Sequence, residues 1–171
     1  MSAAKKLFLL GCLLFIPFYC NAEDQDIVSI KALVSRILPK HESQFEFTKN
    51  KSKAKADAFT LESGKDGRIH IAGNNANSMA VALNYYLNNY CHTTVSWYAE
   101  VPVVVPDKLP GVPNLVKSNA KVKRRFFLNY CTYGYTMPFF SWKEWERLID
   151  WMALNGVNMP LAITGQEAVW Y

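Results

Sequence analysis

Residues 124–132 read RRFFLNYCT, residues 141–161 read SWKEWERLIDWMALNGVNMPL, and residues 165–171 read GQEAVWY. The run from Arg125 to Cys131 leaves few polar positions, which is typical of a strand buried on both faces. Such a strand is expected inside a parallel sheet whose two faces are both covered.

A capped helix and a second strand follow this first strand. Ser141 and Glu144 form an S-x-x-E capping box that starts the helix, and Asn155-Gly156 ends it. Residues 157–163 predict the second strand after a very short turn. A strand, a helix and a strand with tight connections predict a parallel β-α-β unit, here the opening unit of a (β/α)8 barrel.

The side chains of this helix divide into an apolar and a charged set. The predicted buried face comprises Trp142, Trp145, Leu148, Ile149 and Met152. The acidic residues are expected on a solvated face, with a local ion pair to Arg147; they are Glu144, Glu146 and Asp150.

The N-terminus has the features of an export signal. Lys5-Lys6 precede an apolar run over residues 7–18, and small residues allow cleavage after Ala22. A membrane anchor is disfavoured because the run is short and contains Pro17. A lipoprotein signal at Cys20 is the weaker alternative, so an exported protein without a membrane partner is expected, as a secreted, periplasmic or lysosomal protein according to the host.

Cleavage leaves one ordinary domain's length of chain and lowers the net charge from +5 to +3, because two lysines are removed. This charge and the export signal argue against a nucleic-acid partner. Cys91 and Cys131 are expected to be free buried thiols. The sequence has no CxxC, HExxH or His/Cys cluster, so no metal or cofactor is predicted.

Residues 23–98 predict a small N-terminal α/β domain, and residues 99–122 a proline-rich connector to the barrel unit at 123–171. Within this domain, periodic apolar residues predict helices over 27–38 and 79–90, the second with Ser78 or Asn77 as its N-cap. Alternating apolar residues predict strands near 45–48, 59–61, 69–71 and 95–98. The connector is expected to run extended along the surface, with a short strand at 103–105.

Polar side chains follow both predicted barrel strands, where catalytic and binding residues of such barrels lie. Asn129 and Cys131 follow the first strand, and Gln166 and Glu167 follow the second. Amides both donate and accept, which suits sugar hydroxyls. A polyol pocket with aromatic walls is one interpretation, its walls being Tyr133, Tyr135 and Trp170; ordinary loop polarity with core aromatics is the other.

Neither strand end carries a complete catalytic apparatus. Glu167 is the one acid at a strand end, and glycoside hydrolysis needs two carboxyl groups. Cys131 lacks a histidine base in this part of the chain, which excludes a cysteine nucleophile. No catalytic residue is therefore predicted.

The quoted segments, with residues 127–132, the Trp142-x-x-Trp145 helix and residues 165–170, resemble the start of the catalytic barrel of the α-N-acetylglucosaminidases. Residues 23–98 resemble that family's small N-terminal domain. The resemblance implies hydrolysis of terminal α-linked N-acetylglucosamine from glycans, with retention, by two glutamates and without a metal.

The resemblance places those glutamates on later barrel strands, beyond the end of this chain. It implies that Asn129 and Cys131 line the sugar pocket and that Gln166 and Glu167 lie beside it. The chain alone, as an N-terminal portion of such an enzyme, is then expected to be inactive. The alternative is a stand-alone carbohydrate-binding or structural module, with Trp97 and Tyr98 as a sugar platform. The sequence leaves the oligomeric state open.

Overall fold

The computed structural model describes residues 23–50 and 56–161. The predicted export signal and the second strand end, with Gln166 and Glu167, lie outside these residues. No helix within the described residues is long and apolar enough to cross a membrane.

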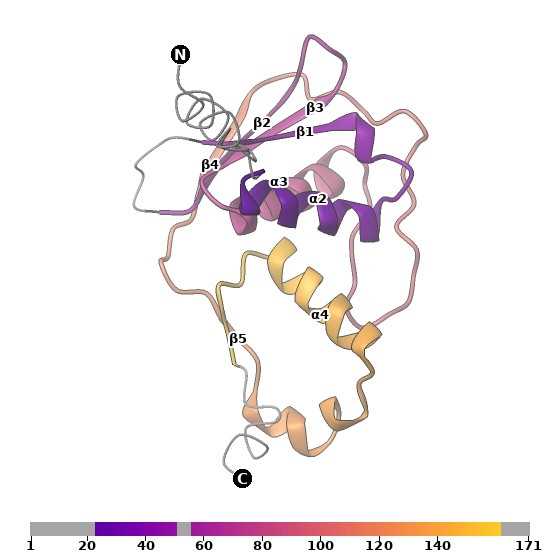
Figure 1. Cartoon of the computed structure of the whole chain (residues 1–171), viewed down its shortest axis with the longest axis vertical. Helices are drawn as coiled ribbons and strands as arrows, with labels where there is room; N and C mark the ends of the chain where they lie inside the picture. Colours follow the sequence, from indigo (N-terminus) through magenta and orange to yellow (C-terminus); the bar gives the residue numbers. More distant parts are fainter. Residues whose placement is uncertain (1–22, 51–55, 162–171) are drawn as a thin grey trace, which may run out of the picture.

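The N-terminal part is a four-stranded sheet with two helices on one face (Figure 1). The strands β1 (Phe45–Lys49), β2 (Ala58–Ser63), β3 (Ile69–Gly73) and β4 (Val116–Asn119) lie in the order β1-β3-β2-β4. β1 pairs parallel with β3, whereas β2 pairs antiparallel with both β3 and β4. Alternate residues of β1, β2 and β3 are buried, as the sequence predicts.

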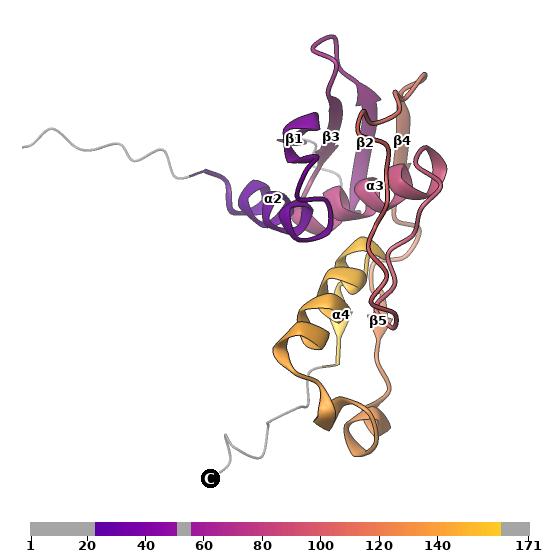
Figure 2. The same ribbon diagram turned by 90° about the vertical axis from the view of Figure 1, so that its right-hand side faces the viewer.

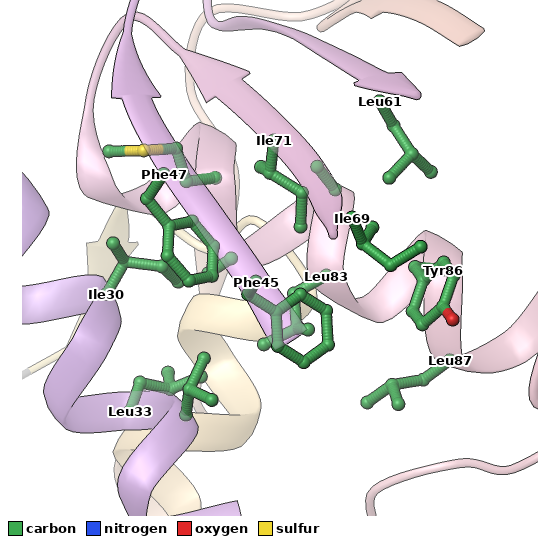
Figure 3. Packing of buried hydrophobic residues seen from close by; sticks show 14 of the residues in the cluster. Ile30, Leu33, Phe45, Phe47, Leu61, Ile69, Ile71, Leu83, Tyr86 and Leu87 are labelled. Atoms are coloured by element: carbon green, nitrogen blue, oxygen red, sulfur yellow. The ribbon is translucent and has the colours of Figure 1, made fainter. Parts of the chain in front are cut away.

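The main core fills the space between the sheet and the helices α2 (Gln25–Ile37) and α3 (Ala76–Asn89). Figure 3 shows Phe47 of β1 directed toward Ile30 of α2, and the Phe45 ring centroid lies 5.8 Å from that of Tyr86 on α3. The predicted apolar stripe of α3 is buried from Met79 to Leu87. α3 begins two or three residues earlier than expected because its N-cap is Asn75, whose Oδ1 accepts a hydrogen bond from the Ser78 N–H at 2.8 Å.

The end of the predicted N-terminal domain and the proline-rich connector differ from their predictions. Residues 95–98 and 103–105 form no strand, and the edge strand of this region is β4 instead. Leu109 and Val112 are buried in the main core. The density of prolines indicates an extended backbone, but it does not indicate which side chains of that backbone the fold brings into the core.

The second part is the predicted parallel β-α-β unit. It consists of β5 (Phe126–Phe127), α4 (Trp142–Leu154) and β6 (Met159–Pro160), with Phe126 opposite Met159. The predicted capping box at Ser141 is present. The first strand is shorter than expected because the backbone leaves the extended conformation at Leu128, and short 3-10 helices follow: η2 (Tyr130–Gly134) and η3 (Met137–Phe139).

The burial of α4 corrects the predicted helix face. Leu148 and Met152 are buried, but Trp142 and Ile149 are exposed. Asp150, predicted on a solvated face, is buried. Arg147 pairs with Glu100, and its charge adds to the hydrogen bonds from Ser141 that lower the pKa of Glu144 on its own helix. The helix turns its charged side toward the first unit, so this side is only partly solvated.

The pairing of Arg36 with Asp150 and Glu146, together with the end of α4, joins the units. Arg36 of α2 donates to both carboxylate oxygens of Asp150, with Nε–Oδ2 at 2.8 Å and Nη2–Oδ1 at 2.6 Å. Leu154 belongs to the main core. Figure 2 shows the last turns of α4 close beneath α2 and α3. This docking fixes the direction of the barrel unit.

Candidate functional site

The candidate site lies at the C-terminal end of β5, remote from the first unit. In Figure 1 the segment after β5, in orange, lies at the foot of the molecule, beyond the N-terminal end of α4. Leu128 has φ +110°, a conformation that a bulky side chain rarely adopts. Such strain persists only where the surrounding structure holds it, and it is enriched at functional sites. No residue pattern in the sequence indicates it.

Asn129 holds this turn with its own side chain. Its Oδ1 accepts a hydrogen bond from the Cys131 N–H at 2.9 Å and caps η2. The Thr132 hydroxyl donates to the Asn129 carbonyl at 2.6 Å. Because Oδ1 is occupied, the Nδ2 group remains as a donor, and it has no acceptor among the described residues. The exposed amide can therefore donate to a ligand oxygen.

Cys131 is an exposed free thiol beside Asn129. The expectation of a buried thiol is wrong here because η2 turns outward after Leu128. Cys91 is half-buried, and burial raises the pKa of its thiol, against a hydrogen bond with Tyr86 that lowers it. The structure thus brings together the first two predicted site residues, Asn129 and Cys131.

Several exposed aromatic side chains occur in the segment between β5 and the first turn of α4. Tyr135, one of the predicted pocket walls, is exposed, whereas the side chain of Tyr133 and all of Trp170 lie outside what the structure describes. Sequence reasoning missed other aromatic residues of this region, each more than half exposed: Tyr130, Phe139 and Trp142. Helical spacing predicted that Trp142 lies in the core. It is exposed because it lies in the first turn of α4, beyond the packed part of the helix.

The carboxylate at the N-terminal end of α4 belongs to Glu144, which caps the helix. Glu144 accepts hydrogen bonds from the Ser141 hydroxyl and from the Ser141 N–H, the latter at 2.7 Å, and both lower the pKa of its carboxyl group. An ionised capping group is a poor general acid near neutral pH. The described part of the site can bind a neutral polar ligand but does not hold the carboxyl pair that glycoside hydrolysis uses.

The opposite end of β5 has a structural role. Arg125 donates to the Asp57 carboxylate and to the Gly156 carbonyl, and to Asn77 Oδ1 at 3.3 Å. Asn77 in turn donates to the Val157 carbonyl at 3.1 Å. The N-terminal end of a barrel strand serves stability, whereas substrates bind at the C-terminal end, so the two ends of β5 have different roles.

Comparison with known proteins gives two family matches in succession. Residues 28–111 match the Alpha-N-acetylglucosaminidase (NAGLU) N-terminal domain, and residues 125–171 match the tim-barrel domain of the same family. Human alpha-N-acetylglucosaminidase is 34% identical over 152 residues, which cover 86% of this chain and 20% of the human protein. The chain thus spans about a fifth of the length of this relative.

Solved structures agree with these matches. CpGH89 from Clostridium perfringens, in complex with its substrate GlcNAc-alpha-1,4-galactose, aligns with a TM-score of 0.78 at 36% identity over 84% of this chain and 16% of its own. A Clostridium perfringens family 89 glycoside hydrolase bound to 2-acetamido-1,2-dideoxynojirmycin gives a TM-score of 0.79 at 32% identity, over 99% of this chain and 19% of its own. The chain belongs to the alpha-N-acetylglucosaminidase family and carries its N-terminal α/β domain followed by the first β-α-β unit of the (β/α)8 barrel.

Proposed function

We propose that this chain is the N-terminal portion of an exported α-N-acetylglucosaminidase that removes terminal α-linked N-acetylglucosamine from glycans with retention. The observation that carries the proposal is the exposed Asn129 amide at the end of the first barrel strand, where barrel enzymes bind substrate. The complex of CpGH89 with its substrate GlcNAc-alpha-1,4-galactose supports a glycan ligand.

In this proposal Asn129 Nδ2 donates to a sugar oxygen, and Cys131 lines the same pocket. The proposal also assigns Gln166 and Glu167, which follow the second predicted strand, to positions beside this pocket. The turn at Leu128 and the cap on η2 hold Asn129 in place, which limits the conformational entropy lost on binding. The two glutamates of the reaction belong to later parts of the family's barrel.

The first experiment tests whether residues 23–171 are inactive alone. Purified protein is incubated with a chromogenic α-N-acetylglucosaminide, and no turnover above a buffer blank is expected, because retaining hydrolysis needs two carboxyl groups about 5 Å apart. Turnover that persists through repurification would contradict this assignment.

The second experiment tests the pocket. This chain replaces its matched segment in the Clostridium perfringens enzyme, and Asn129→Ala is introduced into the chimera. Loss of one hydrogen bond to the sugar, worth roughly 0.5–1.5 kcal/mol, should lower kcat/KM about 2- to 12-fold. Because the substitution also removes the Oδ1 cap of η2, activity is assayed well below the unfolding midpoint of the variant. The control is Asn119→Ala, which removes an exposed amide on β4. Equal kcat/KM for the Asn129 variant and the chimera would remove Asn129 from the pocket.

A stand-alone carbohydrate-binding module is the second candidate, and one observation weighs against it. Trp97, a proposed sugar platform, packs against Trp151 with ring centroids 6.3 Å apart and belongs to the core of the barrel unit. Tyr98 alone remains exposed. A single exposed ring is a small platform for a sugar, so the enzyme portion is favoured.

A further inference from the structure

Thr132 lies at the centre of the turn that carries Asn129 and is bonded on both sides of it. The Thr132 hydroxyl donates to the Asn129 carbonyl at 2.6 Å, and the Thr132 N–H donates to the same oxygen at 3.2 Å. The Thr132 carbonyl accepts a hydrogen bond from the Thr136 N–H at 2.9 Å. Thr132 therefore ties the residue that follows β5 to the start of η3.

The Thr132 hydroxyl also contacts the core of the barrel unit. Its oxygen lies 3.3 Å from the sulfur of Met137, which is buried in that core. A hydroxyl group has a single proton to donate, and the shorter contact assigns this proton to the Asn129 carbonyl. The hydroxyl is thus held between a buried side chain and the backbone of Asn129.

The Asn129 side chain is then fixed at both of its ends. The Cys131 N–H holds Oδ1 at 2.9 Å, and the Thr132 hydroxyl holds the backbone from which the side chain extends. The preceding residue, Leu128, has φ +110°, and a backbone of this kind persists only where its surroundings hold it. Because both ends are fixed, the direction in which Nδ2 can donate is fixed as well.

We infer that Thr132 is a positioning residue of the sugar site, whose hydroxyl holds the Asn129 backbone so that Nδ2 faces the ligand. This inference rests on the proposed function, in which Asn129 Nδ2 donates to a sugar oxygen. Thr132 acts through Asn129 and need not touch the sugar. Without the hydroxyl the amide samples other directions, and the apparent dissociation constant rises in inverse proportion to the fraction of molecules that hold it correctly.

The test uses the chimera with the Clostridium perfringens enzyme, in which Thr132→Val removes the hydroxyl but keeps the shape of the side chain. The Asn129 carbonyl retains the Thr132 N–H as a donor, so the variant is expected to fold. KM for the chromogenic α-N-acetylglucosaminide should rise severalfold, by no more than in Asn129→Ala, while kcat stays within about twofold. A partly unfolded variant would instead lower kcat at unchanged KM.

An equilibrium measurement accompanies the kinetics. The inhibition constant of 2-acetamido-1,2-dideoxynojirmycin, which the related Clostridium perfringens hydrolase binds, should rise by a factor similar to that of KM, because it reports binding without chemistry. Unchanged KM and an unchanged inhibition constant in Thr132→Val would overturn the positioning role.

Two further variants separate the hydroxyl from the packing of the side chain. Thr132→Ser keeps the hydroxyl and should restore the KM of the parent chimera. Thr136→Val makes the same chemical change as Thr132→Val at the N-cap of η3, where the side chain makes no capping hydrogen bond, and should leave KM unchanged. A Thr132→Ser variant that behaves like Thr132→Val would contradict the role of the hydroxyl.

A double-mutant cycle distinguishes failure of this inference from failure of the proposed function. Asn129→Ala keeps the backbone carbonyl that Thr132 holds, so a purely structural role of Thr132 would still show in that background. If Thr132 acts through the amide, Thr132→Val adds no further loss to Asn129→Ala. Additive losses would overturn the positioning role and leave Asn129 in the pocket, whereas an Asn129→Ala variant without effect would remove the sugar contact itself and the inference with it.

Discussion

The pair between Arg36 and Asp150 should dominate the stability of the contact between the two units. Asp150 is 6% exposed, whereas the Arg36 side chain is 35% exposed. Arg36→Met therefore leaves a buried carboxylate without its partner. Breaking a buried pair in this way costs about 3–5 kcal/mol, and partial exposure of Arg36 reduces the expectation to about 2–3 kcal/mol.

The reverse change should cost less. Asp150→Asn leaves a neutral amide that still accepts a hydrogen bond, and the freed guanidinium group can turn to water. We expect a loss of about 1 kcal/mol. The difference between the two variants follows from the unequal exposure of the two partners.

Urea unfolding of residues 23–171, followed by tryptophan fluorescence, measures both losses, since Trp97 and Trp151 lie in the contacting unit. Lys31→Met, on the same helix, is the matched control: its pair with Glu23 is half-exposed on both sides, and a change below about 0.5 kcal/mol is expected. Equal losses for Arg36→Met and Asp150→Asn, or a loss no larger than in the control, would refute the reasoning.

Three further predictions concern the same architecture. Burial opposes ionisation of Asp57, but hydrogen bonds from Arg125 and Asn75 outweigh it and lower the pKa of the carboxyl group; its stabilisation is therefore lost as pH falls below about 4, and urea midpoints of Asp57→Asn should vary less with pH over that range than those of the parent protein. Leu109→Ala should cost about 2–3 kcal/mol by urea unfolding, and limited proteolysis should leave a core that ends beyond residue 119; a stable product ending at 98 would contradict this. Gly156→Ala should cost about 1 kcal/mol or more in the same assay, because φ is +73° and the new Cβ would lie 3.0 Å from Val81, whereas Gly134→Ala, with open space around it, should be neutral.

The sequence predicted those elements whose periodicity is strong and local. The stripe from Met79 to Leu87 and the alternation in β1, β2 and β3 lie where they were expected. The capping box at Ser141 fixed the start of α4. In each case the signal and the structure that it specifies lie within one element, so no distant contact is needed. The domain boundary predicted at residue 98 stays a prediction. The N-terminal sheet itself includes β4, which lies beyond that residue.

The candidate site was predicted in position but not in geometry. Asn129 and Cys131 lie at the strand end as expected, because a polar run after an apolar one marks that point in the chain. The early end of β5 at Phe127 depends on the strained backbone of Leu128, which no residue pattern signals. Gln166 and Glu167 remain predictions outside the described residues.

The sequence by itself determined the family, the β-α-β unit, and the helices and first three strands of the N-terminal part, because these depend on local pattern and on long matched segments. The tertiary structure decided which charges are buried. Asp150 reads as a solvated residue in its helix, and it is buried only because α4 docks against Arg36, 114 positions earlier in the chain. Burial depends on packing between segments that are distant in the sequence, and the periodicity within one segment does not show which distant segment packs against it.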